Sequence, residues 1–248
     1  MNRRKSHSSG VPALRRERSD QPLHVFFIGN SYTNTNDLPE MFAALARSAG
    51  CMLEVGASAP SGWTLSDHAR AKRTLSSLAK QKWDFVILQE QSVIPSVAPE
   101  RNRMMYPAAR SLCRKIRDRG ADAIFFMTWG RRDGLPSLGT RDFLDMQVKL
   151  YYAYLSIARE LNAELAPVGI AWEREVQQDS TPDLWQTDGT HPSEKGTYLT
   201  ACVFYAVIYH QSPEGLTYTD GLSLEEARHL QKIAAETVLN CPECWNLV

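Results

Sequence analysis

The 248-residue sequence lacks several features that would define other classes of protein. No apolar run reaches the roughly 20 residues of a membrane-spanning helix, so no membrane span is expected. No apolar stretch of about 7–15 residues follows the basic residues near the N-terminus, as a secretory signal would require. The formal net charge is zero, with 28 basic and 28 acidic residues, so no global field attracts nucleic acid. We therefore expect a cytoplasmic protein with no nucleic-acid partner.

Cysteines are few and irregularly spaced. There are five, Cys51, Cys113, Cys202, Cys241 and Cys244. An odd number scattered over the whole length does not predict a disulfide framework. Cys241 and Cys244 form a C-x-x-C pair, but a structural zinc site needs four ligands and no second pair accompanies this one. We therefore expect no metal here, and a terminal pair that is either free or bridged.

Short motifs that define other enzyme classes are also missing. The sequence has no H-E-x-x-H, no G-x-x-x-x-G-K-[ST] and no G-x-G-x-x-G. Zinc proteases, P-loop enzymes and dinucleotide-binding enzymes therefore lack the residues they need, and no cofactor is expected. The G-x-S-x-G elbow of the α/β-hydrolases is absent as well.

The start of the chain differs in composition from the rest. Residues 1–20 carry six basic side chains against two acidic ones, a local charge of +4, and have almost no apolar periodicity. Such segments stay disordered because they cannot bury enough apolar surface. We expect a disordered basic tail over residues 1–22, with an anchor for an acidic partner as the alternative role. Residues 23–248 contain no repeat and no low-complexity linker, which predicts one domain.

From residue 23 onward, short apolar runs alternate with segments of helical periodicity. The run Leu23–Ile28 is nearly continuous in apolar residues, as expected for a strand buried on both faces. This alternation predicts an α/β fold, a three-layer αβα sandwich of the flavodoxin-like kind with a central, mostly parallel sheet. Ligands bind such sheets at the carboxyl ends of the strands. Further strands are expected over 51–57, 83–88, 123–127 and 164–168, and helices over 37–50, 65–80, 100–119, 141–162, 193–209 and 223–239.

Ser31 directly follows the first predicted strand. This position is at the carboxyl edge of the sheet, and Gly29 allows a tight turn just before it. Backbone N–H groups after the serine could face a developing oxyanion. An ordinary turn serine is the alternative interpretation.

Asp188 and His191 lie three residues apart, just before a late helix. On a loop this spacing lets the carboxylate hold the imidazole. A hydroxyl nucleophile needs such a pair, a base for its proton and an acid that fixes the tautomer of the base. Helix capping by Ser193 is the alternative, but it gives no reason for the aspartate or the histidine.

Two further segments follow predicted strands. Residues 61–64 contain Gly62, whose N–H could approach an oxyanion with no side chain in the way, although an ordinary turn glycine is the alternative. Residues 88–92 read Leu-Gln-Glu-Gln-Ser, and the amide of Gln89 or of Gln91 could donate to the same oxyanion.

Serine, glycine, glutamine and D-x-x-H thus occur in this order after successive strands. The arrangement resembles the SGNH (GDSL-like) hydrolase family over roughly residues 23–212. Its most specific parts are G-N-S-Y-T at residues 29–33 and D-G-T-H-P-S at residues 188–193, which look like a subgroup of uncharacterised bacterial members.

This resemblance implies a serine ester hydrolase that works through an acyl-serine intermediate. Ser31 would be the nucleophile, His191 the base and Asp188 the residue that orients it. The N–H groups of Ser31 and Gly62 would form the oxyanion hole.

This sequence departs from the family at the segment after the third strand, residues 88–92. Members of the family usually have an asparagine there, and this segment has none. Similarity to the Gln-Gly-Glu segment of sialate O-acetylesterase-like members favours Gln89 as the substitute donor, with Gln91 as the alternative.

We expect a small-molecule ester as substrate, with an acetyl group on a carbohydrate as the favoured case. Trp63, Trp129 and Trp185 lie near predicted loop ends, where they could stack on a sugar or pack in the core. His68 is a second candidate base and a candidate pocket residue. A non-catalytic module that binds a glycan or acylated ligand, and an acyltransferase, remain as alternative functions.

Overall fold

The computed structural model describes residues 21–178 and 183–247. A central sheet of five parallel strands has the order β2-β1-β3-β4-β5. The predicted fold class, an α/β fold with a parallel sheet between helical layers, is therefore confirmed. The predicted tail lies, up to residue 20, outside the described residues. The strands are β1 (Leu23–Ile28), β2 (Leu53–Ser58), β3 (Phe85–Leu88), β4 (Asp122–Phe126) and β5 (Glu164–Ala166).

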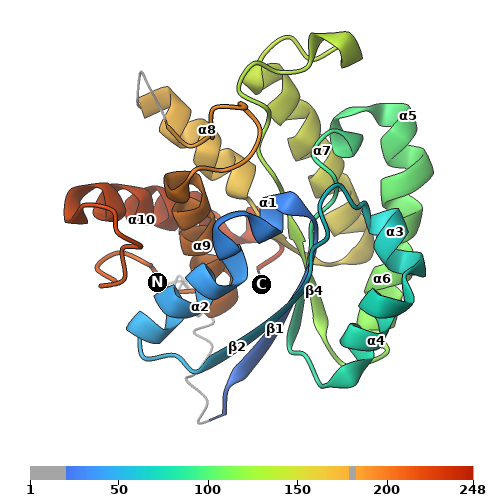
Figure 1. The fold of residues 1–248 in the computed structure, drawn as a ribbon, viewed down its shortest axis with the longest axis horizontal. Coiled ribbons are helices and arrows are strands. Elements are labelled where there is room, and N and C mark those ends of the chain that lie inside the picture. The colour runs from blue at the N-terminus through green and yellow to red at the C-terminus, as the bar shows by residue number, and fades with distance from the viewer. Residues whose placement is uncertain (1–20, 179–182, 248) are drawn as a thin grey trace, which may run out of the picture.

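Helices cover both faces of this sheet (Figure 1). Helices α2 and α9 lie on one side, and α3, α4 and α6 lie on the other. The helices are α1 (Ser31–Asn34), α2 (Leu38–Ser48), α3 (Leu65–Arg70), α4 (Lys72–Lys80), α5 (Ala98–Glu100), α6 (Tyr106–Arg117), α7 (Phe143–Leu161), α8 (Val168–Gln178), α9 (Glu194–Tyr209) and α10 (Leu224–Leu239).

Strands β1 and β3 form because most of their side chains are apolar on both faces and helices cover both faces of the sheet. All four residues of β3 are buried, and so are the last four of β1. Strand β1 lies between β2 and β3, so Phe27 pairs in register with Ala57 of β2 and with Ile87 of β3. Since all strands are parallel, the segments that follow β1, β2, β3 and β4 meet at one edge of the sheet.

The structure differs from the predicted elements in several places. The predicted helix over 65–80 breaks at Ala71, whose extended backbone (φ −75°, ψ 117°) separates α3 from α4. The predicted fifth strand ends at Ala166, two residues early, because α8 begins at Val168. Helix α8 itself was not predicted.

The C-terminal segment is held by hydrogen bonds to α10 and to the residue before β5. Cys241 and Cys244 are joined by a disulfide. Beyond it, Trp245 is buried and donates its indole N–H to the Thr237 carbonyl, and Asn246 donates its amide to the carbonyl of Ala163.

The described residues lack two kinds of feature. No helix in residues 21–178 and 183–247 is long and apolar enough to cross a membrane. The same residues contain no group of three or more His, Cys, Asp or Glu side chains that could hold a metal ion.

Candidate active site

Ser31 is the first residue of α1, directly above the end of β1. Asn30 caps this short helix, because its side-chain oxygen accepts a hydrogen bond from the Tyr32 N–H at 3.1 Å. The serine side chain is half-buried, so its hydroxyl has access to solvent. The turn from strand to helix thus places a hydroxyl at the carboxyl edge of the sheet.

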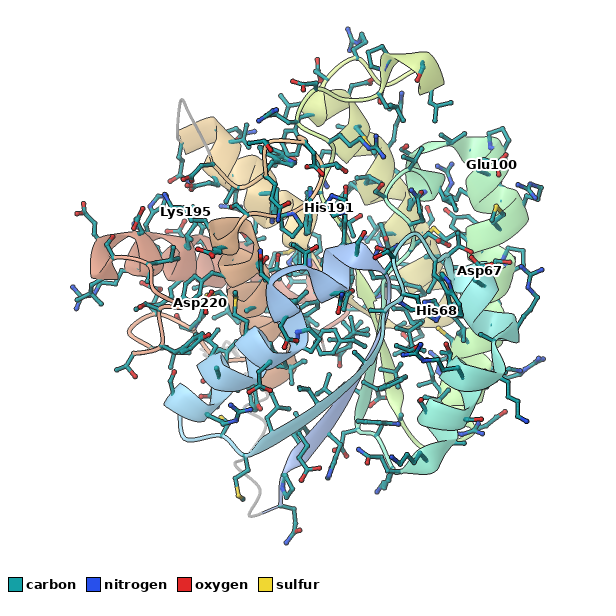
Figure 2. All side chains as sticks on the ribbon, viewed as in Figure 1. Asp67, His68, Glu100, His191, Lys195 and Asp220 are labelled. Atoms are coloured by element: carbon teal, nitrogen blue, oxygen red, sulfur yellow. A yellow bond between two sulfur atoms is a disulfide. The ribbon has the colours of Figure 1, made fainter. Side chains whose placement is uncertain are left out.

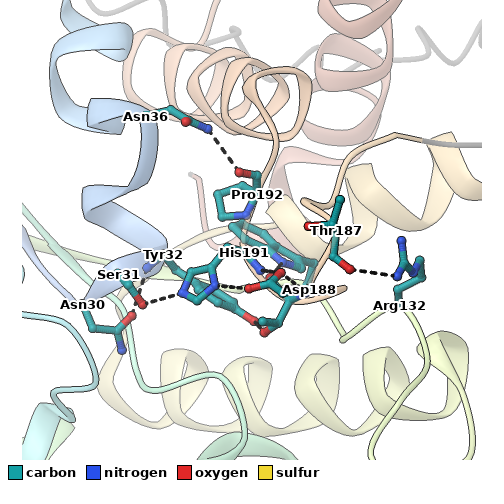
Figure 3. A network of polar contacts seen from close by, with 11 residues as sticks. Asn30, Ser31, Tyr32, Asn36, Arg132, Thr187, Asp188, His191 and Pro192 are labelled. Atoms are coloured by element: carbon teal, nitrogen blue, oxygen red, sulfur yellow. Dashed lines mark hydrogen bonds and ion pairs between the residues drawn. The ribbon is translucent and has the colours of Figure 1, made fainter.

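His191 and Asp188 approach this hydroxyl from the loop before α9 (Figure 3). The His191 Nε2 lies 2.9 Å from the Ser31 Oγ, and the His191 Nδ1 lies 2.5 Å from an Asp188 carboxylate oxygen. The side chains of His191 and Asp188 are 33% and 44% exposed, so the three residues are open to a ligand. The structure therefore brings together the three residues that the sequence singled out, across 160 positions of chain.

The Asp188 carboxylate is held in its ionised form. Burial raises the pKa of Asp188, but hydrogen bonds from the His191 ring and from the N–H groups of Thr190 and His191 outweigh it, so the pKa lies below its usual value. An ionised carboxylate on Nδ1 leaves Nε2 as the nitrogen that faces the serine.

Aromatic packing supports the histidine loop from below. The Tyr32 ring stacks on Trp129 with centroids 4.7 Å apart, and Trp129 stacks on Trp172 at 4.0 Å. The Trp129 indole N–H donates to the Thr190 carbonyl at 3.0 Å, and the hydroxyls of Tyr32 and Thr190 are 2.6 Å apart. Both bonds hold Thr190, the residue before His191, so the aromatic stack supports the position of the imidazole above the sheet.

Two backbone N–H groups are free to bind an anion beside the serine. Gly62 is the third residue of a turn closed by a bond from the Trp63 N–H to the Pro60 carbonyl, and its φ of +75° suits glycine. Within residues 21–178 and 183–247, neither the Gly62 N–H nor the Ser31 N–H has a protein acceptor.

Gln89 does not have the role expected from the sequence. It is fully buried, and its amide N–H groups donate to the Asn30 side chain at 2.9 Å and to the Glu90 carbonyl. Its oxygen accepts from the Asn30 N–H and from the Thr33 hydroxyl. With both donors used inside the protein, Gln89 has none left for an oxyanion, and the first choice of donor is corrected.

Gln91, unlike Gln89, has a side-chain N–H that is not used inside the protein. It is half-exposed, and its oxygen accepts from the N–H groups of Val93 and Ile94. Its amide nitrogen makes a single long contact, 3.3 Å to the Ser92 hydroxyl, so one N–H remains available.

Asn30 links the three loops around the serine, a role that the sequence analysis missed. Besides capping α1 and accepting from Gln89, it donates its amide to the Trp63 carbonyl at 2.9 Å. One side chain thus connects the segments after β1, β2 and β3. Its place inside the G-N-S-Y-T motif was the available signal.

His68 and Trp129 were expected to face a substrate, and both are buried. The His68 Nε2 lies 2.7 Å from the Gly29 carbonyl oxygen and its Nδ1 lies 2.8 Å from the Thr74 hydroxyl, so both ring nitrogens are occupied. Burial lowers the pKa of His68, which keeps it neutral. Figure 2 shows His68 on α3, away from His191.

Of the three tryptophans expected near the site, two are buried and one is partly exposed. Trp129 is fully buried in the aromatic stack, and Trp185 is buried beside Trp172. Neither can stack on a sugar. Trp63 remains partly exposed next to Gly62, and its ring lies against His68 with centroids 5.0 Å apart.

Glu90 is a fully buried carboxyl group between the segments that follow β2 and β3. One oxygen accepts from the N–H groups of Leu65, at 3.1 Å, and Gln91, at 2.7 Å, while the other has no partner in the described part of the chain. Burial raises the pKa of Glu90 to about 7. The carboxyl ties the start of α3, just after Gly62, to the segment that follows β3.

Comparison with known proteins places this arrangement in a family. No protein-family model and no curated protein matches the chain. Among solved structures, a protein of Slackia heliotrinireducens assigned to the SGNH hydrolases is 30% identical, with a TM-score of 0.64 over 74% of this chain and 97% of its own.

Two other structures are similar in fold at lower identity. A DUF4886 family protein from Bacteroides uniformis has a TM-score of 0.76 at 18% identity, and the match covers 90% of this chain and 96% of that protein. A variant of Axe2, an acetyl-xylooligosaccharide esterase from Geobacillus, has a TM-score of 0.59 at 16% identity, over 84% of this chain and all of that one.

The fold and the site together define a hydrolase of the SGNH/GDSL type. The chain belongs to the SGNH hydrolase family.

Proposed function

We propose that this hydrolase cleaves its ester through an acyl-serine intermediate with Ser31 as nucleophile, His191 as general base and acid, and Asp188 as the group that orients the imidazole. The observation that carries the proposal is the chain of two hydrogen bonds, 2.9 Å from serine to histidine and 2.5 Å from histidine to aspartate. A binding module would have no need of that relay, so its convergence favours catalysis over the non-catalytic alternative.

The reaction follows from the positions of these groups. The Ser31 Oγ attacks the ester carbonyl carbon while the His191 Nε2 takes its proton, and Asp188 stabilises the imidazolium. When the tetrahedral intermediate collapses, Nε2 returns the proton to the leaving alcohol. Water then attacks the acyl-serine with the same histidine as base, which releases the acid and restores the serine.

Three donors are proposed for the oxyanion. The N–H groups of Ser31 and Gly62 have no described protein acceptor, and the Gln91 amide has one N–H to spare. Gln91 therefore replaces Gln89 as the proposed substitute for the asparagine of the family.

The test is hydrolysis of p-nitrophenyl acetate by the wild type, Ser31→Ala and His191→Ala. Each variant should lose roughly 10⁴–10⁶ in kcat, as removal of a triad member does. Ser156→Ala removes an exposed serine hydroxyl far along the chain and should retain activity. A fluorophosphonate should label Ser31 in the wild type. Equal activity in wild type and Ser31→Ala would refute the mechanism.

For the substrate we propose a short acyl ester, with acetyl on a carbohydrate as the favoured case. The support is the acetyl-xylooligosaccharide esterase among the structural neighbours and the partly exposed Trp63 beside Gly62, where an indole can stack on a sugar ring. Acetate release from acetylated xylooligosaccharides should exceed hydrolysis of p-nitrophenyl octanoate. Trp63→Ala should raise KM for the oligosaccharide more than KM for p-nitrophenyl acetate, and the reverse order would contradict a stacking role.

A further inference from the structure

Arg131 lies beside the histidine loop on the segment that follows β4. Trp129, two residues before it, and Arg132, directly after it, are hydrogen-bonded to that loop. Trp129 donates its indole N–H to the Thr190 carbonyl at 3.0 Å, and the Arg132 N–H donates to the Gly189 carbonyl at 2.9 Å. The backbone of Arg131 is therefore held between two contacts with the residues that connect Asp188 to His191.

The Arg131 side chain is mostly buried but has no counter-ion among the described residues. Its Nε is buried and has no hydrogen-bond acceptor, and no carboxylate of the described residues lies within 4.0 Å of its guanidinium. Other arginines have such partners, for example Arg110, which forms a two-pronged pair with Glu160. Asp188, the acid on the adjoining loop, uses its oxygens on His191 and Thr190.

The positive charge of Arg131 acts on the site itself. It lowers the pKa of the Tyr32 hydroxyl, against the larger opposite effect of burial. The Tyr32 ring contacts His191 edge-on, with centroids 5.7 Å apart. The guanidinium is thus near enough for its field to reach the floor of the site.

Such a charge is costly unless something neutralises it. Taking a cation out of water without an opposite charge is unfavourable, and guanidinium groups recognise carboxylates and phosphates through paired N–H donors. An anionic group on the bound substrate would supply the missing acceptor.

We infer that Arg131 selects substrates that carry an anionic group, a carboxylate above all, close to the ester that Ser31 attacks. This inference rests on the proposed function and adds the charge of the substrate to it. The predicted acetylated carbohydrate would then be an acidic one.

Two pairs of esters that differ mainly in charge test the inference, each corrected for hydrolysis without enzyme. Mono-p-nitrophenyl glutarate against p-nitrophenyl pentanoate places the charge in the acyl half. Potassium 4-acetoxybenzoate against 4-acetoxybenzamide places it in the alcohol half. In one of these pairs, the ratio of kcat/KM for the anionic to the neutral ester should fall roughly ten- to a hundredfold from wild type to Arg131→Gln.

Two variants serve as controls. Arg131→Lys keeps the charge and should retain part of the ratio. Arg119→Gln removes an exposed arginine before β4, at the opposite edge of the sheet, and should keep the wild-type ratio. A ratio that is the same in wild type and Arg131→Gln for both pairs would overturn the inference.

The wild type alone gives a second measurement, independent of whether Arg131→Gln folds. It should hydrolyse the cationic ester acetylthiocholine at least about tenfold more slowly than the uncharged isostere S-(3,3-dimethylbutyl) thioacetate. Equal rates would overturn the inference while leaving the proposed function intact. A wild type inactive on every one of these esters would instead overturn the proposed function, and the inference with it.

Discussion

Replacing Glu90 by glutamine should remove a pH dependence of stability. The folded protein holds the pKa of this carboxyl at about 7, against 4.5 for the unperturbed group, because the side chain is buried and one oxygen has no partner. Between these two pH values the unfolded chain loses a proton that the folded protein keeps. The stabilisation is therefore fully present below about pH 4.5 and is lost as the pH rises through 7.

The size of the effect follows from the same two values. Each unit of pKa difference corresponds to about 1.4 kcal/mol, so ionising Glu90 in the folded state costs about 3 kcal/mol. A glutamine at this position keeps an oxygen for the N–H groups of Leu65 and Gln91 but does not titrate. The free energy of unfolding of Glu90→Gln relative to wild type should rise by about 3 kcal/mol between pH 4 and pH 8.

Urea denaturation at several pH values measures this difference directly. Glu225→Gln, which removes an exposed carboxyl on α10, is the matched control and should follow the wild-type curve. If the curves for wild type and Glu90→Gln ran parallel over the whole range, the carboxyl would not change its charge on folding and the reasoning would be refuted.

Four further substitutions test other parts of the site. Gly29→Ala places a Cβ closer than 3.0 Å to the side-chain oxygens of Thr33 and Gln89, so it should lower the free energy of unfolding by roughly 1–3 kcal/mol, and an unchanged urea midpoint would contradict this close approach. Asp188→Asn should lower kcat for p-nitrophenyl acetate about 10⁴-fold through the wrong imidazole tautomer, and a loss under tenfold would argue against the orienting role. Gln91→Ala should lower kcat roughly 10²–10³-fold, whereas Gln89→Ala should mainly lower Tm, and the opposite pattern would restore Gln89 as the donor.

Most of the sheet could be predicted because its strands are covered on both faces. A continuous apolar run such as Val25–Ile28 has few other places in a soluble protein, and turn residues mark its end. Helix α8 was missed because it follows β5 after a single residue, so one apolar stretch contains the end of a strand and the start of a helix. The break at Ala71 was missed because the apolar periodicity continues across it.

The relay of Ser31, His191 and Asp188 could be anticipated because it depends on features that are local in sequence. Three residues of loop bring the carboxylate to the imidazole, and the position after β1 defines the edge where the serine lies. The direction in which a side chain near this edge of the sheet points is not determined by its local sequence. His68 and Gln89 have the chemistry of site residues, but they are turned inward, to hydrogen bonds that only the assembled loops provide.

The order of the strands has a consequence for synthesis on the ribosome. In the order β2-β1-β3-β4-β5, the first strand made has a neighbour on each side. Every later strand pairs with the outermost strand already made on its side of the sheet. The sheet can therefore grow outward as the chain emerges, without inserting a strand between two others. His191 follows the last strand, so the nascent chain acquires the proposed nucleophile first and the proposed proton acceptor only after the whole sheet has been translated. A nascent chain that ends before His191 therefore contains Ser31 and every strand but lacks His191 and α9, so we expect it to have no esterase activity.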